Sequence, residues 1–226
     1  MPLHPNGVHH LAISTRDIKA QIQFFTDVLG GSLKALYWMH GAENTFHGFV
    51  ELDPQCYLAF VQQPDNPDVR ELGLTHAGNP AGAVAAGVMQ HVAMNVDTLD
   101  DLLALRDRIR SRGVAVFGPM NHGMCQSIYF AGPEGLCLEI ATGGAIDARA
   151  WLDPEVVGLA GFSADELARC VTPAEFTRPS EAVTQPADDP AKPRLAYAPE
   201  QYAFMLAVPD EAMWSAVPSE PPVRVF

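Results

Sequence analysis

The chain has 226 residues, of which 48% are hydrophobic and 18% charged, so it can bury the core of a folded domain and is not a disordered or coiled-coil sequence. Acidic residues outnumber basic ones by 27 to 14, which gives a formal net charge of −13. Nucleic acids and anionic membrane surfaces are bound by clustered Lys and Arg, so the charge balance argues against both partners. It leaves room for a small-molecule substrate.

Targeting and redox signals predict a cytoplasmic protein. Residues 1–8 contain two prolines and no apolar run, so they do not resemble a secretory signal. No stretch approaches the roughly 18 apolar residues that a membrane-spanning helix needs. The four cysteines form no CxxC pair, and we expect them to be reduced thiols: Cys56, Cys125, Cys137 and Cys170.

Residues 6–62 predict a first βαβββ module. The apolar run 8–14 is typical of a strand, Asp17 follows as a helix N-cap, and apolar residues recur at helical spacing up to the Gly30-Gly31 pair. Short turn sequences then separate three further expected strands, at 32–40, 45–52 and 56–62.

A second module is expected at 89–142, after a loop-rich connector at 63–88. It repeats the order of the first: a strand at 89–96, a helix from Leu99 that closes before Gly113, and strands at 115–117, 124–130 and 136–142. Like modules can pair their sheets around a shared cleft. The expected fold class is therefore α+β, with two paired βαβββ modules forming a cupped sheet.

The segment 143–226 differs from both modules. It contains 11 of the 19 prolines and has 13 acidic against 6 basic residues. Short helices are expected at 153–159 and 163–170, followed by an extended linker over 178–199. Apolar residues near its end, including Tyr202 and Trp214, predict that the tail docks on its own core or on a second subunit.

Three side chains are candidate metal ligands. His10 and His91 occupy equivalent places in the first strands of the two modules, and Glu139 lies within an apolar strand. A carboxylate in such a strand is costly unless something compensates its charge, and a divalent metal does so with imidazole and carboxylate ligands. The alternative is that Glu139 faces solvent and that each histidine is an ordinary core or surface residue.

The first module offers no counterpart of Glu139, because Leu58 and Ala59 stand at the matching positions. A site with two histidines and one carboxylate leaves coordination positions open, as in non-haem Fe(II) enzymes. We therefore favour Fe(II), with Mn(II), Ni(II) or Zn(II) as alternatives.

The chain resembles the vicinal oxygen chelate superfamily, which includes glyoxalase I, fosfomycin-resistance proteins and type I extradiol dioxygenases. The resemblance covers about residues 6–142 and is most specific in the segment Ile128–Glu139; the strand openings Val8–Ile13 and Gln90–Ala93 also carry it. It implies paired βαβββ modules around a divalent metal held by His10, His91 and Glu139.

Within the superfamily, the end of the second module is most similar to the extradiol dioxygenases. That similarity implies catalytic roles for His122 and Tyr129 in moving protons. It also predicts an acid–base histidine on the fourth strand of the first module, where this chain has Cys56. His47 or His76 is a possible replacement.

The interpretation is a metal-dependent oxidoreductase, an extradiol ring-cleaving dioxygenase acting on a catechol-like small molecule. The enzyme alternative is a glyoxalase-like isomerase or lyase, and the alternative from another class is a non-catalytic small-ligand binding protein. We expect no nucleic-acid or membrane partner, and the paired modules and apolar tail are compatible with a homodimer.

Overall fold

The computed structural model describes residues 3–221. The chain folds into two compact units, the larger formed by Pro5–Met39 and Asn44–Pro173. The smaller unit includes residues 40–43 and the chain from Ala174 onward. The larger unit holds both β-sheets and is the part that builds the candidate site.

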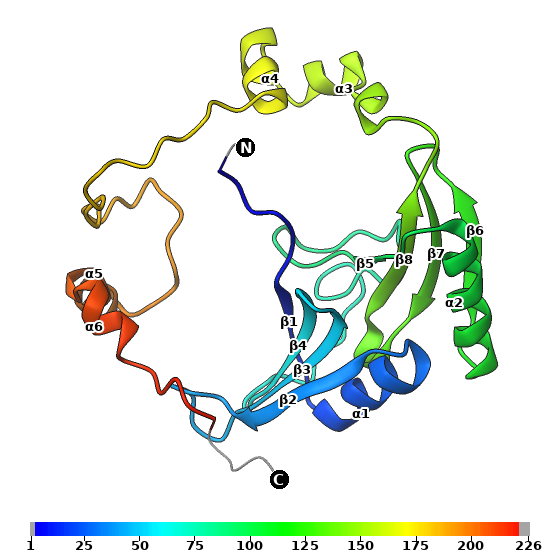
Figure 1. Ribbon diagram of the computed structural model, residues 1–226, viewed down its shortest axis with the longest axis horizontal. Coiled ribbons are helices and arrows are strands. Elements are labelled where there is room, and N and C mark those ends of the chain that lie inside the picture. Colours follow the sequence, from blue (N-terminus) through cyan, green and yellow to red (C-terminus); the bar gives the residue numbers. More distant parts are fainter. Residues whose placement is uncertain (1–2, 222–226) are drawn as a thin grey trace. The chain divides into compact units, whose positions relative to one another are not determined.

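The first sheet contains four strands in the order β1-β4-β3-β2 (Figure 1). Strands β1 and β4 are parallel, and the other neighbours are antiparallel. Its elements are β1 (His10–Ser14), α1 (Ile18–Gln23), the π-helical turn η1 (Phe24–Val28), β2 (Ser32–Trp38), β3 (Phe46–Asp53) and β4 (Cys56–Gln62).

The second sheet repeats this topology, with the order β5-β8-β7-β6 and a parallel β5–β8 pair. Its elements are β5 (Val92–Asn95), α2 (Leu99–Ser111), β6 (Val116–Asn121), β7 (Cys125–Ala131), the 3-10 turn η2 (Pro133–Gly135) and β8 (Cys137–Gly143). Two βαβββ modules are thus present, and the predicted α+β fold class is confirmed.

Helices α1 and α2 each begin after a residue whose side chain caps the helix N-terminus. The Asp17 carboxylate accepts a hydrogen bond from Ala20 N at the start of α1, and the Thr98 hydroxyl accepts one from Asp101 N at the start of α2. Helix α1 packs on β3 and β4, while α2 packs on β6, β7 and β8 (Figure 1). Each helix therefore covers one face of its own sheet.

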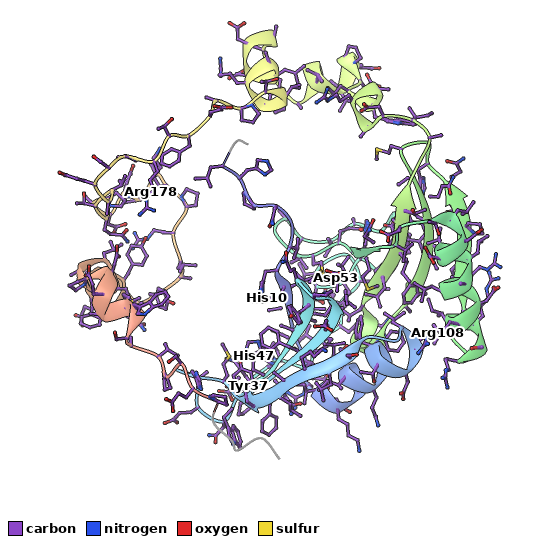
Figure 2. All side chains as sticks on the ribbon, viewed as in Figure 1. His10, Tyr37, His47, Asp53, Arg108 and Arg178 are labelled. Atoms are coloured by element: carbon purple, nitrogen blue, oxygen red, sulfur yellow. The ribbon has the colours of Figure 1, made fainter. Side chains whose placement is uncertain are left out.

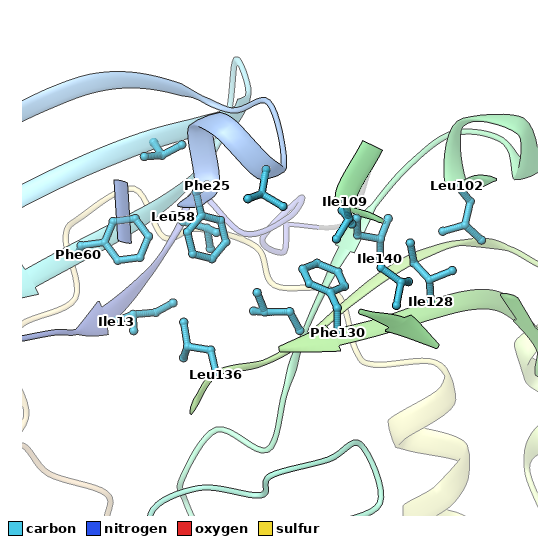
Figure 3. Packing of buried hydrophobic residues seen from close by; sticks show 14 of the residues in the cluster. Ile13, Phe25, Leu58, Phe60, Leu102, Ile109, Ile128, Phe130, Leu136 and Ile140 are labelled. Carbon is cyan, nitrogen blue, oxygen red and sulfur yellow. The ribbon is translucent and has the colours of Figure 1, made fainter. Parts of the chain in front are cut away.

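The covered faces of the two sheets share one hydrophobic core (Figure 3). Strand alternation sends Ile13 and Phe60 from the first sheet, and Ile128 and Ile140 from the second, into this cluster. Burial of such side chains is the main favourable term in folding. Because one face of each sheet is used for the core, the polar side chains between these positions lie on the opposite faces.

Polar contacts also join the modules. Arg108 on α2 donates from Nε to Val28 O at 2.9 Å. Glu134, in η2, accepts hydrogen bonds from Thr15 Oγ1 at 2.5 Å and Gln21 Nε2 at 2.7 Å. Its carboxylate therefore ties the hairpin between β7 and β8 to the first helix.

Beyond β8 the larger unit continues through η3 (Ala148–Trp151), α3 (Pro154–Leu159) and α4 (Ala164–Val171), and the smaller unit contains α5 (Pro199–Ala207) and α6 (Asp210–Trp214). Residues 173–198 form neither helix nor strand. Among residues 3–221, no helix combines the length and apolar character needed to cross a membrane.

Candidate metal and substrate site

Glu139 and His91 lie within hydrogen-bond distance of each other on the uncovered face of the second sheet. Glu139 lies in the middle of β8 and is only 5% exposed, and its Oε2 is 2.9 Å from His91 Nε2. His91 immediately precedes β5, and its Nδ1 contacts the side-chain oxygen of Gln90. Among the described residues, the basic side chain in contact with the Glu139 carboxylate is an imidazole and not Lys or Arg.

Tyr129 lies beside this pair, because the antiparallel register places it directly opposite Glu139. Its hydroxyl is 3.1 Å from His122 Nε2, on the loop between β6 and β7. Burial raises the pKa of Tyr129, and the nearby Glu139 carboxylate adds to this effect although a hydrogen bond with Ser127 opposes it. The phenol consequently remains protonated at neutral pH.

These four side chains line one pocket with a volume of about 710 Å³. The pocket belongs wholly to the second module and to the segment directly after it. The lining combines polar side chains with apolar ones, as is typical of small-molecule sites. The remaining lining residues are Asn121, Gly123, Met124, Cys125, Ile146 and Trp151.

His10, the third predicted ligand, lies on the uncovered face of the first sheet (Figure 2). Its Nδ1 is 3.0 Å from His9 Nδ1, and its ring meets Phe49 edge-on at 5.5 Å between centroids. Within residues 3–221, no three His, Cys, Asp or Glu side chains lie close enough together to hold a metal ion. The structure thus brings His91 and Glu139 together without His10, whose role as a ligand stays a prediction.

The registers of the two sheets identify the first-module counterpart of Glu139. Ala93 pairs with Glu139 in the second sheet, and the equivalent Ala12 pairs with Ala59 in the first. The counterpart is therefore Ala59, one of the two residues expected from the spacing. Its methyl group cannot bind a metal.

Cys56 and His47 lie on opposite faces of the first sheet. Strand alternation puts Cys56 on the same side of β4 as the core residues Leu58 and Phe60. His47 shares the uncovered face with His10, and its Nδ1 is 3.3 Å from the Tyr37 hydroxyl (Figure 2). Of the two histidines considered as replacements for the missing base, His47 is the one on this face.

His47 is also electrostatically unusual. Burial lowers its pKa, and the nearby His10 lowers it further. Its Nε2 is buried without a hydrogen-bond partner among the described residues. His76 is different, since it lies in the connector with Nδ1 2.8 Å from Thr75 Oγ1.

Sequence reasoning missed Ile146 and Trp151. Both follow the second module, in the segment interpreted as tail, and both line the pocket. The only signal in the sequence was an apolar residue shortly after the last strand, followed by a tryptophan. The repeat of the two modules could not identify either residue as part of the pocket, because neither has an equivalent in the first module.

The chain is thus an α+β protein of two repeated βαβββ modules, with an imidazole–carboxylate pair on an open sheet face. The chain belongs to the Glyoxalase/Bleomycin resistance protein/Dioxygenase superfamily, whose profile matches residues 7–140. The resemblance to the vicinal oxygen chelate superfamily inferred from the sequence is thereby confirmed.

Two curated relatives come from Rhodococcus globerulus. Biphenyl-2,3-diol 1,2-dioxygenase 2 is 28% identical and biphenyl-2,3-diol 1,2-dioxygenase 3 is 25% identical, each over 131 residues. These alignments cover 58% of this chain and 60% of each relative, so the chain matches well under two thirds of their length.

A solved structure supports the fold. The crystal structure of a glyoxylase/bleomycin resistance protein/dioxygenase domain from Frankia sp. EAN1pec matches with a TM-score of 0.50 and 16% sequence identity. The match covers 62% of this chain and 99% of that domain. The chain therefore carries about 80 residues or more outside the common fold, in keeping with its long C-terminal segment.

Proposed function

We propose that this protein is a metal-dependent dioxygenase that opens the ring of a catechol-like small molecule beside one of its hydroxyl groups. The observation that supports the proposal is that one pocket contains both the His91–Glu139 pair, which suits a metal, and the His122–Tyr129 pair, which suits proton transfer. The names of the two Rhodococcus relatives point in the same direction.

The His91–Glu139 pair suits a divalent metal. Glu139 is a buried carboxylate with an imidazole nitrogen 2.9 Å away, and this is a donor set that divalent transition metals prefer. Fe(II) is the metal we propose, and when held by these residues it would supply the redox chemistry that a reaction with dioxygen needs. His10 would be the third ligand.

His10 lies on the first sheet, whereas the pocket lies on the second sheet. A second copy of the chain would therefore have to supply the third ligand. A second copy of the chain can present its own first sheet to the pocket, which agrees with the homodimer expected from the sequence. Formation of the homodimer would therefore complete the metal site.

The remaining residues handle protons and exclude water. Tyr129 keeps its proton at neutral pH, so it can donate a hydrogen bond to a substrate oxygen. His122 lies exposed at the pocket rim within 3.1 Å of that hydroxyl, where its imidazole can accept a proton from a catechol hydroxyl. Apolar lining side chains, including Met124, reduce the access of water.

The test is oxygen uptake by the Fe(II)-loaded full chain with catechol as the probe. One O₂ should be consumed for each ring opened, with both oxygen atoms in the product, and His91→Ala should abolish the reaction. His76→Ala, in the connector, is the matched control and should retain it. Anaerobic turnover with Mn(II), Ni(II) or Zn(II) would instead identify an isomerase or lyase, and stoichiometric binding without turnover would identify a binding protein.

A further inference from the structure

We propose that Trp151, supported by Ile146, is the specificity-determining wall of the pocket and selects substrates with a planar aromatic ring. This inference rests on the proposed function, for which it names the feature of the substrate that is recognised. Both residues lie outside the segment 7–140 that matches the superfamily.

The two side chains are open to the pocket. Trp151 is 55% exposed and Ile146 is 48% exposed, and both line the cavity that contains His91 and Glu139. Exposure of an indole and a neighbouring aliphatic side chain inside a concave site leaves apolar surface that a ligand can cover. The wall therefore has free surface for a ring next to the polar pair.

The segment that carries these residues is fixed to the second sheet. Gly144 N donates to Met124 O at 2.9 Å, and Ile146 N donates to Gly123 O at 3.1 Å. The Asp147 carboxylate then accepts from Arg149 N at 2.8 Å and starts the 3-10 turn η3 that contains Trp151. The wall is thus attached to the same loop that holds His122.

Gly123 makes room for the indole. Its φ is +81°, a conformation that favours glycine, and a Cβ built there would lie 2.8 Å from Trp151 Cζ2 and 3.2 Å from Ile146 Cδ1. The indole therefore packs directly over the backbone of the loop. A side chain at position 123 would push Trp151 and Ile146 away, so their position depends on glycine at this position of the loop.

The chemistry of this wall favours an aromatic ligand. An indole face stacks on a planar π-system and gains more from it than from a puckered ring of similar size. The polar pairs, in contrast, can bind the hydroxyl groups of any vicinal diol. The ratio of the affinities for an aromatic and a saturated diol therefore reports on contact with Trp151 and Ile146, because the polar groups can bind both diols.

The experiment is a calorimetric titration of the full chain, metal-free and Zn(II)-loaded, with catechol and with cis-cyclohexane-1,2-diol. Trp151→Ala should weaken catechol binding about fivefold and change diol binding less than about twofold, while Trp151→Phe should restore most of the preference. Trp214→Ala, which removes a 90% exposed indole in the smaller unit, is the matched control and should change neither.

Equal loss of both probes in Trp151→Ala, or a wild-type chain that does not prefer catechol, overturns the inference. Absence of ring cleavage with a preserved Trp151-dependent preference contradicts the proposed function and leaves the wall intact. The two failures are therefore distinguishable, because the titration requires no turnover.

Discussion

Tyr129 illustrates how much chemistry depends on one hydroxyl group. Its ring meets those of His91 and His122 edge-on, while its OH is 3.1 Å from His122 Nε2 and its strand position pairs with Glu139. Burial followed by the Glu139 charge keeps its pKa above the ordinary tyrosine value. A protonated phenol beside an imidazole is suited to donate a hydrogen bond throughout the neutral pH range.

Tyr129→Phe keeps the ring and removes the donor. We expect kcat for ring opening to fall about 100-fold, with KM changing little, because a positioned acid–base group typically contributes at least this factor. In the wild type, activity should decline at strongly alkaline pH, where the phenol loses its proton, and this alkaline decline should be absent from the variant. Steady-state oxygen uptake between pH 6 and 11 measures both effects.

Unchanged kcat in Tyr129→Phe would contradict the role of Tyr129 as a proton donor. The matched control is Tyr202→Phe in the smaller unit, whose ring lies 4.4 Å from Arg194 Cζ. This control should retain wild-type kcat.

At the scale of elements, Glu134 connects the two modules. Burial alone would raise its pKa, but hydrogen bonds from Thr15, the Arg16 backbone and Gln21 outweigh that effect and hold the pKa below its usual value. A depressed carboxylate pKa means that the charged form stabilises the folded state. This contribution is present above the unfolded-state pKa and is lost as the pH falls through the folded-state pKa.

Glu134→Gln should therefore reduce the free energy of unfolding by about 1 kcal/mol at neutral pH, a value kept modest because the side chain is partly solvated. The difference in the free energy of unfolding between wild type and variant should become smaller as the pH falls below the usual glutamate pKa. Urea denaturation at a series of pH values measures this difference. The control is Glu175→Gln, which changes an exposed glutamate of the smaller unit. A deficit that stays constant at acidic pH would show that the charge is not what matters.

The sequence predicted most of the elements, and its errors have physical reasons. The helix expected from Leu99 is α2, and the repeated order of strands is present. The strand expected at 115–117 continues to Asn121, because β6 is an edge strand. Pro119 is tolerated there because the β6–β7 register shifts between Phe117 and Met120, which leaves Pro119 out of the ladder.

The site was predictable only in part. The repeat identified His91, and the cost of a charged residue in an apolar strand identified Glu139, and these two side chains are in contact. Tyr129 and His122 came from family resemblance. The contribution of Trp151 depends on hydrogen bonds between the segment after β8 and the 123–124 loop, which no local pattern encodes.

At the scale of the whole molecule, the distribution of candidate ligands predicts sharing between two copies. His10 is on one uncovered sheet face and the His91–Glu139 pair is on another, and the described residues contain no group of three donors. A two-fold dimer would bring each first sheet to the partner's second sheet and form two identical sites.

Mixing two inactive variants tests this arrangement. His10→Ala and Glu139→Gln should each fail to retain metal, while a refolded equimolar mixture should recover about a quarter of the wild-type content, because half of the dimers are mixed and each has one intact site. No recovery, with both variants dimeric by analytical ultracentrifugation, would contradict sharing between copies.

We propose that His91 and Glu139 belong to an iron centre, and the metal content of anaerobically purified protein is the measurement to make first. We predict about one iron per chain in the wild type and almost none in Glu139→Gln, with Glu175→Gln as the control that retains it. Wild-type protein that binds no metal after reconstitution with Fe(II), or a Glu139→Gln variant that retains iron fully, would contradict the claim.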